Sequence, residues 1–200
     1  KREEDDERND LLLKFANLIA NLQPRYFVME NVQGLVSSDA RKYLDMFLSK
    51  IEESGFDFIE PLKILNERNY GVPQDRKRLF VLGFRKGVDK PSYPNQSIED
   101  SNVWDAIRDI PSNLQAQKIE DGVLKAKLGT PSEYVKKINS WSRNEENGRS
   151  GLSGMEPVNH EDRIRQRFSK VIPGDRDETS GYHRLRKIEP SYTLRAGSSR

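Results

Sequence analysis

Two short polar motifs hold the residues of this sequence that are best suited to chemistry. In the first, Glu30 and Asn31 follow directly on an apolar run at 26–29. A carboxyl group at the end of a strand lies where open α/β sheets hold their ligands, at the carboxyl edge. This position makes Glu30 a candidate site residue, although an ordinary loop glutamate would also fit the local sequence.

The second motif is the run Gly-Val-Pro-Gln-Asp-Arg-Lys-Arg at 71–78, which comes directly before an apolar run at 79–84. Alternate residues of an extended segment project to the same face, so we expect Arg76 and Arg78 to point the same way. Two planar guanidinium groups can hold phosphate oxygens or a base carbonyl in a cleft. A solvated basic rim before a buried strand is the alternative.

The segments around these motifs must position them. Apolar residues recur at helical spacing in 11–22 and 43–51, which predicts two amphipathic helices. The run at 26–29 predicts a buried parallel strand, and 56–65 and 79–84 predict further extended segments. Helix, strand, helix, strand, strand is the order of the closing half of an open α/β sheet.

The composition excludes several classes of function. The 200 residues contain no cysteine and two histidines, which rules out disulfides and a cysteine nucleophile and argues against a metal site. No apolar run is long enough to span a bilayer, and the charged residues 1–10 are unlike a signal peptide. These features predict a soluble, cytoplasmic protein with no metal and no membrane contact.

The second half of the sequence differs in texture and in charge. Prolines and polar residues predict a linker at 87–111, and scattered glycines and charges predict an irregular, strand-containing module at 112–200. Lys and Arg number 16 against 18 Asp and Glu in residues 1–100, but 18 against 14 in residues 101–200. A mildly basic second half suits a polyanionic partner, although surface solubility would explain it as well.

Three arginines in this second half, Arg163, Arg165 and Arg167, alternate along the chain. On a strand they would form a row of phosphate contacts, and on a helix they would occupy a solvated face. We favour phosphate contact, because these residues lie in the module that would meet the polyanion.

The two polar motifs together resemble those of the DNA cytosine-5 methyltransferases. Between residues 28 and 78 this sequence has Val-Met-Glu-Asn-Val-x-Gly-Leu, then a predicted helix, then Pro-Gln-x-Arg-x-Arg at the head of a predicted strand. This arrangement matches two signature motifs of that family in the same order. Residues 103–107 resemble the family's link into target recognition, and residues 183–194 resemble the late part of the recognition region. The similarity therefore touches most of the chain.

The resemblance implies a reaction and a role for each motif residue. A target cytosine is flipped out of double-stranded DNA, a cysteine thiolate adds to C6, and C5 takes a methyl group from S-adenosylmethionine. Glu30 matches the glutamate that gives a proton to N3, Arg78 matches the arginine that contacts O2, and Arg76 matches the arginine near the nucleophile and backbone. We interpret Asn31 and Gln74 as positioning residues.

The sequence also departs from the family, because it contains no Gly-rich cofactor motif and no Pro-Cys loop. We therefore expect an internal fragment of a bacterial enzyme with an α/β fold. Residues 1–86 would form the second half of the Rossmann-like sheet of a methyltransferase that uses S-adenosylmethionine, 87–111 a linker, and 112–200 part of a target-recognition domain.

We expect this chain to be inactive alone and to bind no S-adenosylmethionine, and a restriction endonuclease is a candidate partner of the whole enzyme. A noncatalytic DNA-binding or regulatory subunit and one half of a split enzyme are the alternatives.

Overall fold

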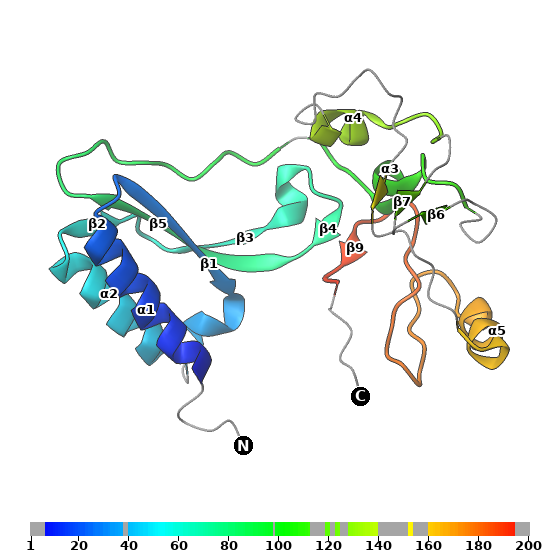
Figure 1. Ribbon diagram of the computed structural model, residues 1–200, viewed down its shortest axis with the longest axis horizontal. Coiled ribbons are helices and arrows are strands. Elements are labelled where there is room, and N and C mark those ends of the chain that lie inside the picture. The colour runs from blue at the N-terminus through cyan, green and yellow to red at the C-terminus, as the bar shows by residue number, and fades with distance from the viewer. Residues whose placement is uncertain are drawn as a thin grey trace. The chain divides into compact units, whose positions relative to one another are not determined.

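The computed structural model describes residues 7–37, 40–97, 99–112, 119–120, 123–124, 128–139, 152–153 and 160–194. The chain divides into two compact units, and Figure 1 labels most of their helices and strands. The first unit comprises Lys1–Tyr70 and Arg76–Ser97, and the second comprises Gly71–Asp75 and Ile98–Arg200. The division falls inside the second polar motif, which therefore contributes residues to both units.

The described part of the first unit contains two α-helices, two 3-10 helices and four strands. In chain order these are α1 (Glu7–Leu22), β1 (Tyr26–Val32), η1 (Gln33–Val36), α2 (Arg41–Glu53), β2 (Phe56–Phe58), β3 (Lys63–Asn66), η2 (Glu67–Tyr70) and β5 (Lys77–Arg85). Strand β5 is central, because β1 pairs with one of its edges and β2 and β3 pair with the other. All of these pairings are antiparallel.

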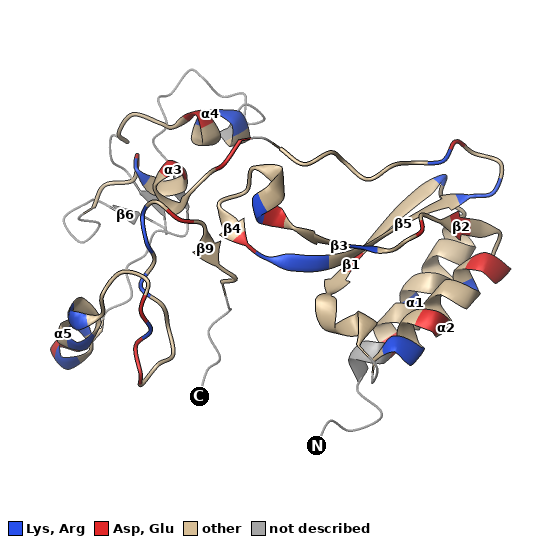
Figure 2. Ribbon diagram, turned by 180° about the vertical axis from the view of Figure 1, so that it is seen from behind, with Lys and Arg blue, Asp and Glu red and all other residues tan. Residues whose placement is uncertain are grey.

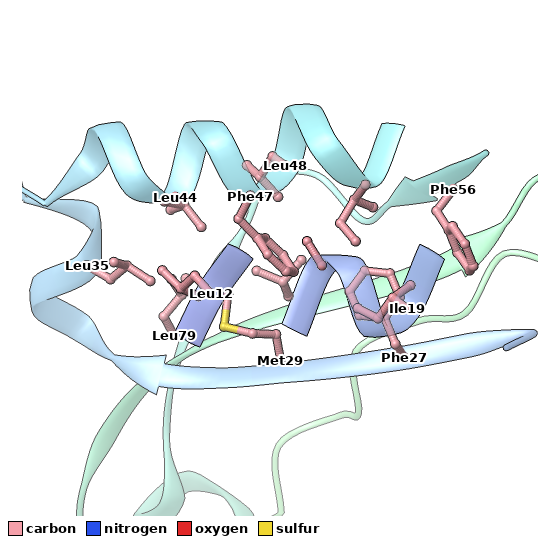
Figure 3. Packing of buried hydrophobic residues seen from close by; sticks show 13 residues of the cluster. Leu12, Ile19, Phe27, Met29, Leu35, Leu44, Phe47, Leu48, Phe56 and Leu79 are labelled. Atoms are coloured by element: carbon pink, nitrogen blue, oxygen red, sulfur yellow. The ribbon is translucent and has the colours of Figure 1, made fainter. Parts of the chain in front are cut away.

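Apolar side chains on one face of this sheet pack against α1 and α2, as Figure 3 shows. The ring of Phe27 lies 6.2 Å from that of Phe47 and 5.9 Å from that of Phe56, each edge to face. Gly83 lies opposite Phe27 in the strand register, and a Cβ at this position would come within 1.9 Å of the ring. The buried cluster consists of Leu12, Ala16, Ile19, Phe27, Met29, Leu35, Leu44, Phe47, Leu48, Ile51, Phe56, Leu79 and Val81. This core fixes β1 and β5, the two strands beside which the polar motifs lie.

Most of the elements predicted for the first unit are confirmed. Both helices and the strand at 79–84 are present, and the extended chain at 56–65 contains β2 and β3. The prediction of a buried parallel strand at 26–29 is wrong for this chain. Strand β1 pairs antiparallel with β5, and its residues alternate between buried and exposed, with Val28 57% exposed. An apolar run of this length indicates a strand, but it determines neither the direction in which the strand pairs nor whether both of its faces are buried.

The described part of the second unit contains short elements. They are β4 (Gln74–Asp75), α3 (Val103–Ile107), β6 (Ile119–Glu120), β7 (Val123–Leu124), α4 (Glu133–Asn139), β8 (Leu152–Ser153), α5 (Asp162–Lys170) and β9 (Ser191–Tyr192). Strands β6, β7 and β8 form an antiparallel sheet, and β4 pairs parallel with β9. The strand-containing character predicted for 112–200 is confirmed in the part of this range that the structure describes. The functional division into catalytic part, linker and recognition part stays a prediction.

Polar contacts hold the described parts of the second unit. A capping box begins α3: Asn102 Oδ1 accepts a hydrogen bond from the N–H of Asp105, and the Asp105 carboxylate accepts one from the N–H of Asn102. Further along the chain, Arg184 Nη1 donates to the carbonyl of Val171 at 2.8 Å. None of the helices in the described residues is long and apolar enough to cross a membrane.

Candidate functional site

Strand pairing brings parts of both polar motifs together in the first unit. In the register of β1 and β5, Glu30 lies opposite Phe80 and Val32 lies opposite Arg78, so Glu30 and Arg78 are diagonal neighbours. Diagonal neighbours on one face of an antiparallel pair are within reach of long side chains. The residues that alternate with Glu30 along β1 are buried toward the helices, so Glu30 lies on the opposite face of the sheet.

The carboxylate of Glu30 contacts both arginines of the second motif. Its Oε1 lies 2.9 Å from Arg78 Nε and 3.5 Å from Arg76 Nη2. Arg78 also donates from Nη1 to the carbonyl of Lys77 at 2.8 Å. The Arg78 side chain is 17% exposed and that of Glu30 is 42% exposed. The cluster therefore combines a partly open carboxyl group with one firmly held guanidinium and a second, more distant one.

Asn66 and Glu67, at the end of β3 and the start of η2, fix the position of Arg76. The N–H of Arg76 donates to Asn66 Oδ1 at 3.1 Å, and the carbonyl of Arg76 accepts from the N–H of Glu67 at 3.0 Å. The guanidinium Nε of Arg76 forms an ion pair with Glu67 Oε1 at 3.1 Å. Sequence reasoning missed both residues. The turn-forming Gly71 and Pro73 between two extended segments were the available signal, because they indicate a chain reversal that sets 66–67 beside 76–77.

A tyrosine beyond the second motif fixes the strand residue that lies opposite Glu30. The hydroxyl of Tyr93 donates to the carbonyl of Phe80 at 2.8 Å, and the ammonium of Lys63 lies 5.0 Å from the centre of the Tyr93 ring. Burial raises the pKa of the Tyr93 hydroxyl above its ordinary value. Tyr93 thus helps to hold β5 in place beside the carboxylate.

The two predicted positioning residues have other local partners. Asn31 lies on the helix-facing side of β1, and its Oδ1 accepts a hydrogen bond from the N–H of Val32. Gln74 belongs to the second unit, where it lies in the β4–β9 pair and donates from Nε2 to Ser191 Oγ at 3.4 Å. Asn31 and Glu30 therefore point to opposite faces of the sheet, and the roles of Asn31 and Gln74 stay predictions.

The arginines at 163, 165 and 167 lie on a helix, so of the two structures considered for this segment the helix is the one found. Figure 2 shows the Lys and Arg residues of α5 in blue. Arg163 pairs with Glu161 at 2.7 Å, and Arg167 pairs with Asp177 Oδ1 at 3.0 Å. Residues four apart share a helix face, so Arg163 and Arg167 lie on one side and the exposed Arg165 on the other. Contact of these arginines with phosphates stays a prediction.

Asp177, the partner of Arg167, is almost fully buried. Its Oδ2 accepts hydrogen bonds from the hydroxyl of Ser180 at 2.6 Å and from the N–H of Ser180 at 2.7 Å. These bonds, with the charge of Arg167 as a further cause, hold the pKa of the Asp177 carboxyl below its ordinary value. Arg167 is therefore tied into the fold of the second unit through a carboxylate that stays ionised.

Comparison with known proteins relates this chain to one protein family. The profile of the family described as C-5 cytosine-specific DNA methylase matches residues 1–196. Type II methyltransferase M.XorII of Xanthomonas oryzae pv. oryzae is 34% identical over 211 residues, which covers 100% of this chain and 49% of that protein. Type II methyltransferase M.DdeI of Desulfomicrobium norvegicum is 29% identical over 181 residues, which covers 85% of this chain and 40% of that protein. The chain spans about half the length of these relatives, or less.

A solved structure has the same fold. It is a crystal structure of a protein described as a DNA modification methyltransferase encoded within an E. coli prophage, with a TM-score of 0.73 and 21% sequence identity. The similarity covers 95% of this chain and 58% of that chain. This match confirms the α/β fold class, part of a Rossmann-like methyltransferase, that the sequence predicts. With the profile matching nearly every residue, the chain belongs to the C-5 cytosine-specific DNA methylase family.

Proposed function

We propose that this sequence forms the base-activating part of a DNA cytosine-5 methyltransferase. That enzyme transfers a methyl group from S-adenosylmethionine to C5 of a cytosine flipped out of double-stranded DNA. The observation that carries the proposal is the 2.9 Å contact between Glu30 and Arg78, which joins the two motifs in one cluster. The family match supports the reaction, and the type II methyltransferases among the relatives support DNA as its substrate.

Glu30 is the acid in this proposal. A nucleophile that adds to C6 of cytosine pushes negative charge into the ring, and a proton delivered to N3 removes that charge. Both ion pairs of Glu30 use Oε1. Oε2 has no ion pair in the part of the chain that the structure describes, which leaves this oxygen available for the proton exchange with N3.

Arg78 and Arg76 hold the base and its surroundings. Arg78 uses Nε for Glu30 and Nη1 for the Lys77 carbonyl, and a guanidinium carries five N–H donors in all. Its remaining donors suit O2 of the cytosine, which becomes more negative when the nucleophile adds. The side chain of Arg76 is 35% exposed, twice as much as that of Arg78, and suits the phosphate backbone beside the base.

In this proposal, residues outside this sequence supply the nucleophile and the cofactor site. The sequence contains no cysteine. An adenosine cofactor binds at the carboxyl ends of parallel strands beside a helix N-terminus, whereas the described strands of the first unit pair only antiparallel. The described residues therefore do not fit S-adenosylmethionine, and we propose that the chain alone neither binds it nor transfers methyl groups. Among these residues no group of carboxylates and histidines is arranged to hold a metal ion.

Double-stranded DNA is the proposed partner of both units. Arg163 and Arg165 have exposed side chains on α5, and we assign phosphate contacts to these two first. Arg167 contributes less directly, because its pairing with Asp177 fixes the helix that carries the others. The type II names of the relatives support a restriction endonuclease as a further partner of the enzyme.

The test uses the full-length protein that carries this sequence, with unmethylated DNA and S-adenosylmethionine. Mass spectrometry of the digested DNA measures 5-methylcytosine. We expect Glu30→Gln and Arg78→Ala each to slow its formation at least about a hundredfold while most of the DNA binding remains. The matched control Glu52→Gln, which removes an exposed carboxylate from α2, should methylate normally. A wild-type protein that binds DNA and forms no 5-methylcytosine would be a noncatalytic subunit, and this result would overturn the proposal.

A further inference from the structure

Glu67 is an acidic residue beside the site that lies outside both motifs. Its Oε1 is 3.1 Å from Arg76 Nε, and its side chain is 29% exposed. We propose that Glu67 is a positioning residue for methyl transfer: it fixes the guanidinium of Arg76 and thereby keeps the carboxylate of Glu30 open to the base. This inference rests on the proposed function, and it adds a residue to the machinery of the same site.

Arg76 lies between two carboxylates at unequal distances. Its Nε is 3.1 Å from Glu67 Oε1 but makes no hydrogen bond to the described residues, and its Nη2 donates a hydrogen bond to Glu30 Oε1 at 3.5 Å, which is the outer limit of such a bond. Attraction between opposite charges grows as their separation falls, so the charge attraction of Arg76 to Glu67 is stronger than that to Glu30, although Glu30 accepts the hydrogen bond. Glu30 in turn has Arg78 as its closer partner, at 2.9 Å.

Loss of the Glu67 carboxylate would change which carboxylate Arg76 contacts most closely. Arg76 would then have Glu30 as its remaining acidic partner among the ion pairs described at the site. The strong geometry of an arginine–carboxylate pair is bidentate, with two parallel N–H···O bonds to both carboxylate oxygens. Such a pair would occupy Oε2 of Glu30, the oxygen that we assign to N3 of cytosine. Glu67 therefore protects the reactive oxygen by holding Arg76 to one side.

The main chain of Arg76 does not depend on the Glu67 side chain. Asn66 Oδ1 accepts from the N–H of Arg76 at 3.1 Å, and the N–H of Glu67 donates to the Arg76 carbonyl at 3.0 Å. Both bonds survive a change of the Glu67 carboxylate to an amide. A Glu67→Gln variant therefore isolates the orientation of the Arg76 guanidinium from the folding of this segment.

The test measures steady-state methylation by the full-length protein and by its Glu67→Gln variant. We expect kcat to fall about tenfold, with KM for S-adenosylmethionine within about twofold of wild type, because the change acts on the chemical step and not on cofactor binding. Glu67→Asp keeps the charge and should recover most of kcat. Glu67→Gln combined with Arg76→Ala should be no slower than Arg76→Ala alone, since Glu67 acts only through Arg76.

Thermal unfolding of each variant accompanies the kinetics, with Glu52→Gln as the matched charge control. A wild-type kcat in Glu67→Gln, or an equal fall of kcat in Glu52→Gln, would overturn the inference. Unfolding of both Glu67 variants at the assay temperature would also overturn it, because the residue would then serve the fold. A wild-type protein without methylation would overturn the proposed function together with this inference, whereas an active wild type with an unaffected Glu67→Gln would overturn the inference alone.

Discussion

In the first unit, helices and strands pack around aromatic rings, whereas in the second unit arginine side chains donate hydrogen bonds to the backbone of turns. In the first, Phe47 and Phe56 are fully buried and both contact the ring of Phe27 edge to face. In the second, Arg184 donates to the carbonyl of Val171. Apolar burial depends little on pH or salt, but charge-assisted hydrogen bonds depend on both. The two units should therefore respond differently to the same change of conditions.

Glycines show the same contrast. Gly83 in β5 leaves room for the ring of Phe27. Gly174 has a φ of 98°, which L side chains rarely adopt, and the guanidinium of Arg186 lies over it, 2.1 Å from where a Cβ would stand. Arg186 also donates from Nε to the carbonyl of Pro173 at 3.2 Å. One glycine serves the packing of a core, and the other serves a turn that an arginine covers.

The largest effect that we expect from this difference is that of Phe47→Ala. The ring is fully buried at the centre of the aromatic cluster, so its loss should lower the free energy of unfolding of the first unit by about 3–5 kcal/mol. Hydrogen exchange followed by mass spectrometry should show faster exchange in α2 and β5 and little change in α5. The neighbouring Met46 is half exposed, and Met46→Ala should change stability by less than about 0.5 kcal/mol. Equal losses of protection in both units would break the comparison.

A smaller effect is expected for Gly83→Ala. A methyl group at this position overlaps the Phe27 ring, which the core holds in place, so the variant should lose about 1–3 kcal/mol of stability in denaturant unfolding. Gly34→Ala is the matched control, because a Cβ there meets nothing within 4 Å. Gly83→Ala with the stability of Gly34→Ala would show that the aromatic core is looser than the structure indicates.

The smallest effect is expected from acidification, which should destabilise the second unit more than the first. Hydrogen bonds from Ser180, aided by Arg167, lower the pKa of Asp177 in the folded state. A lowered pKa contributes stability above the ordinary Asp value of about 3.9, and this contribution is lost as the pH falls through the folded-state value. Hydrogen exchange at successively lower pH should therefore show residues 160–194 opening before β5. In Asp177→Asn this pH dependence should disappear, and an unchanged profile in that variant would contradict the assignment.

Periodicity and apolar runs were sufficient to predict the elements of the first unit. The spacing of Leu12, Phe15 and Ile19 predicted one helix, because a helix that packs by one face repeats its apolar residues every three or four positions. The apolar run at 79–84 predicted the central strand. The direction of β1 could not be predicted in this way. Side-chain alternation is the same in parallel and antiparallel strands, so the residues at 26–29 carry no information on the partner.

The candidate site was predicted only in part, because local sequence does not determine how strands pair. The types and spacing of Glu30, Arg76 and Arg78 indicated that they are candidate site residues. Their contact, however, depends on the register of β1 and β5, which local sequence does not determine. Glu67 lies outside the motifs and becomes significant only once the chain reversal after β3 brings it to Arg76. The arginines of α5 remained ambiguous because alternation of charges fits an exposed helix as well as a strand.

The most direct test of the central claim is a double-mutant cycle on Glu30 and Arg78 in the full-length protein, read out as the single-turnover rate of methyl transfer. The cycle compares wild type, Glu30→Gln, Arg78→Ala and the double variant. If the two side chains act as one unit on the cytosine, the double variant should be no more than about threefold slower than the slower single variant. Losses that multiply, as they do for independent sites, would contradict a shared role for the cluster.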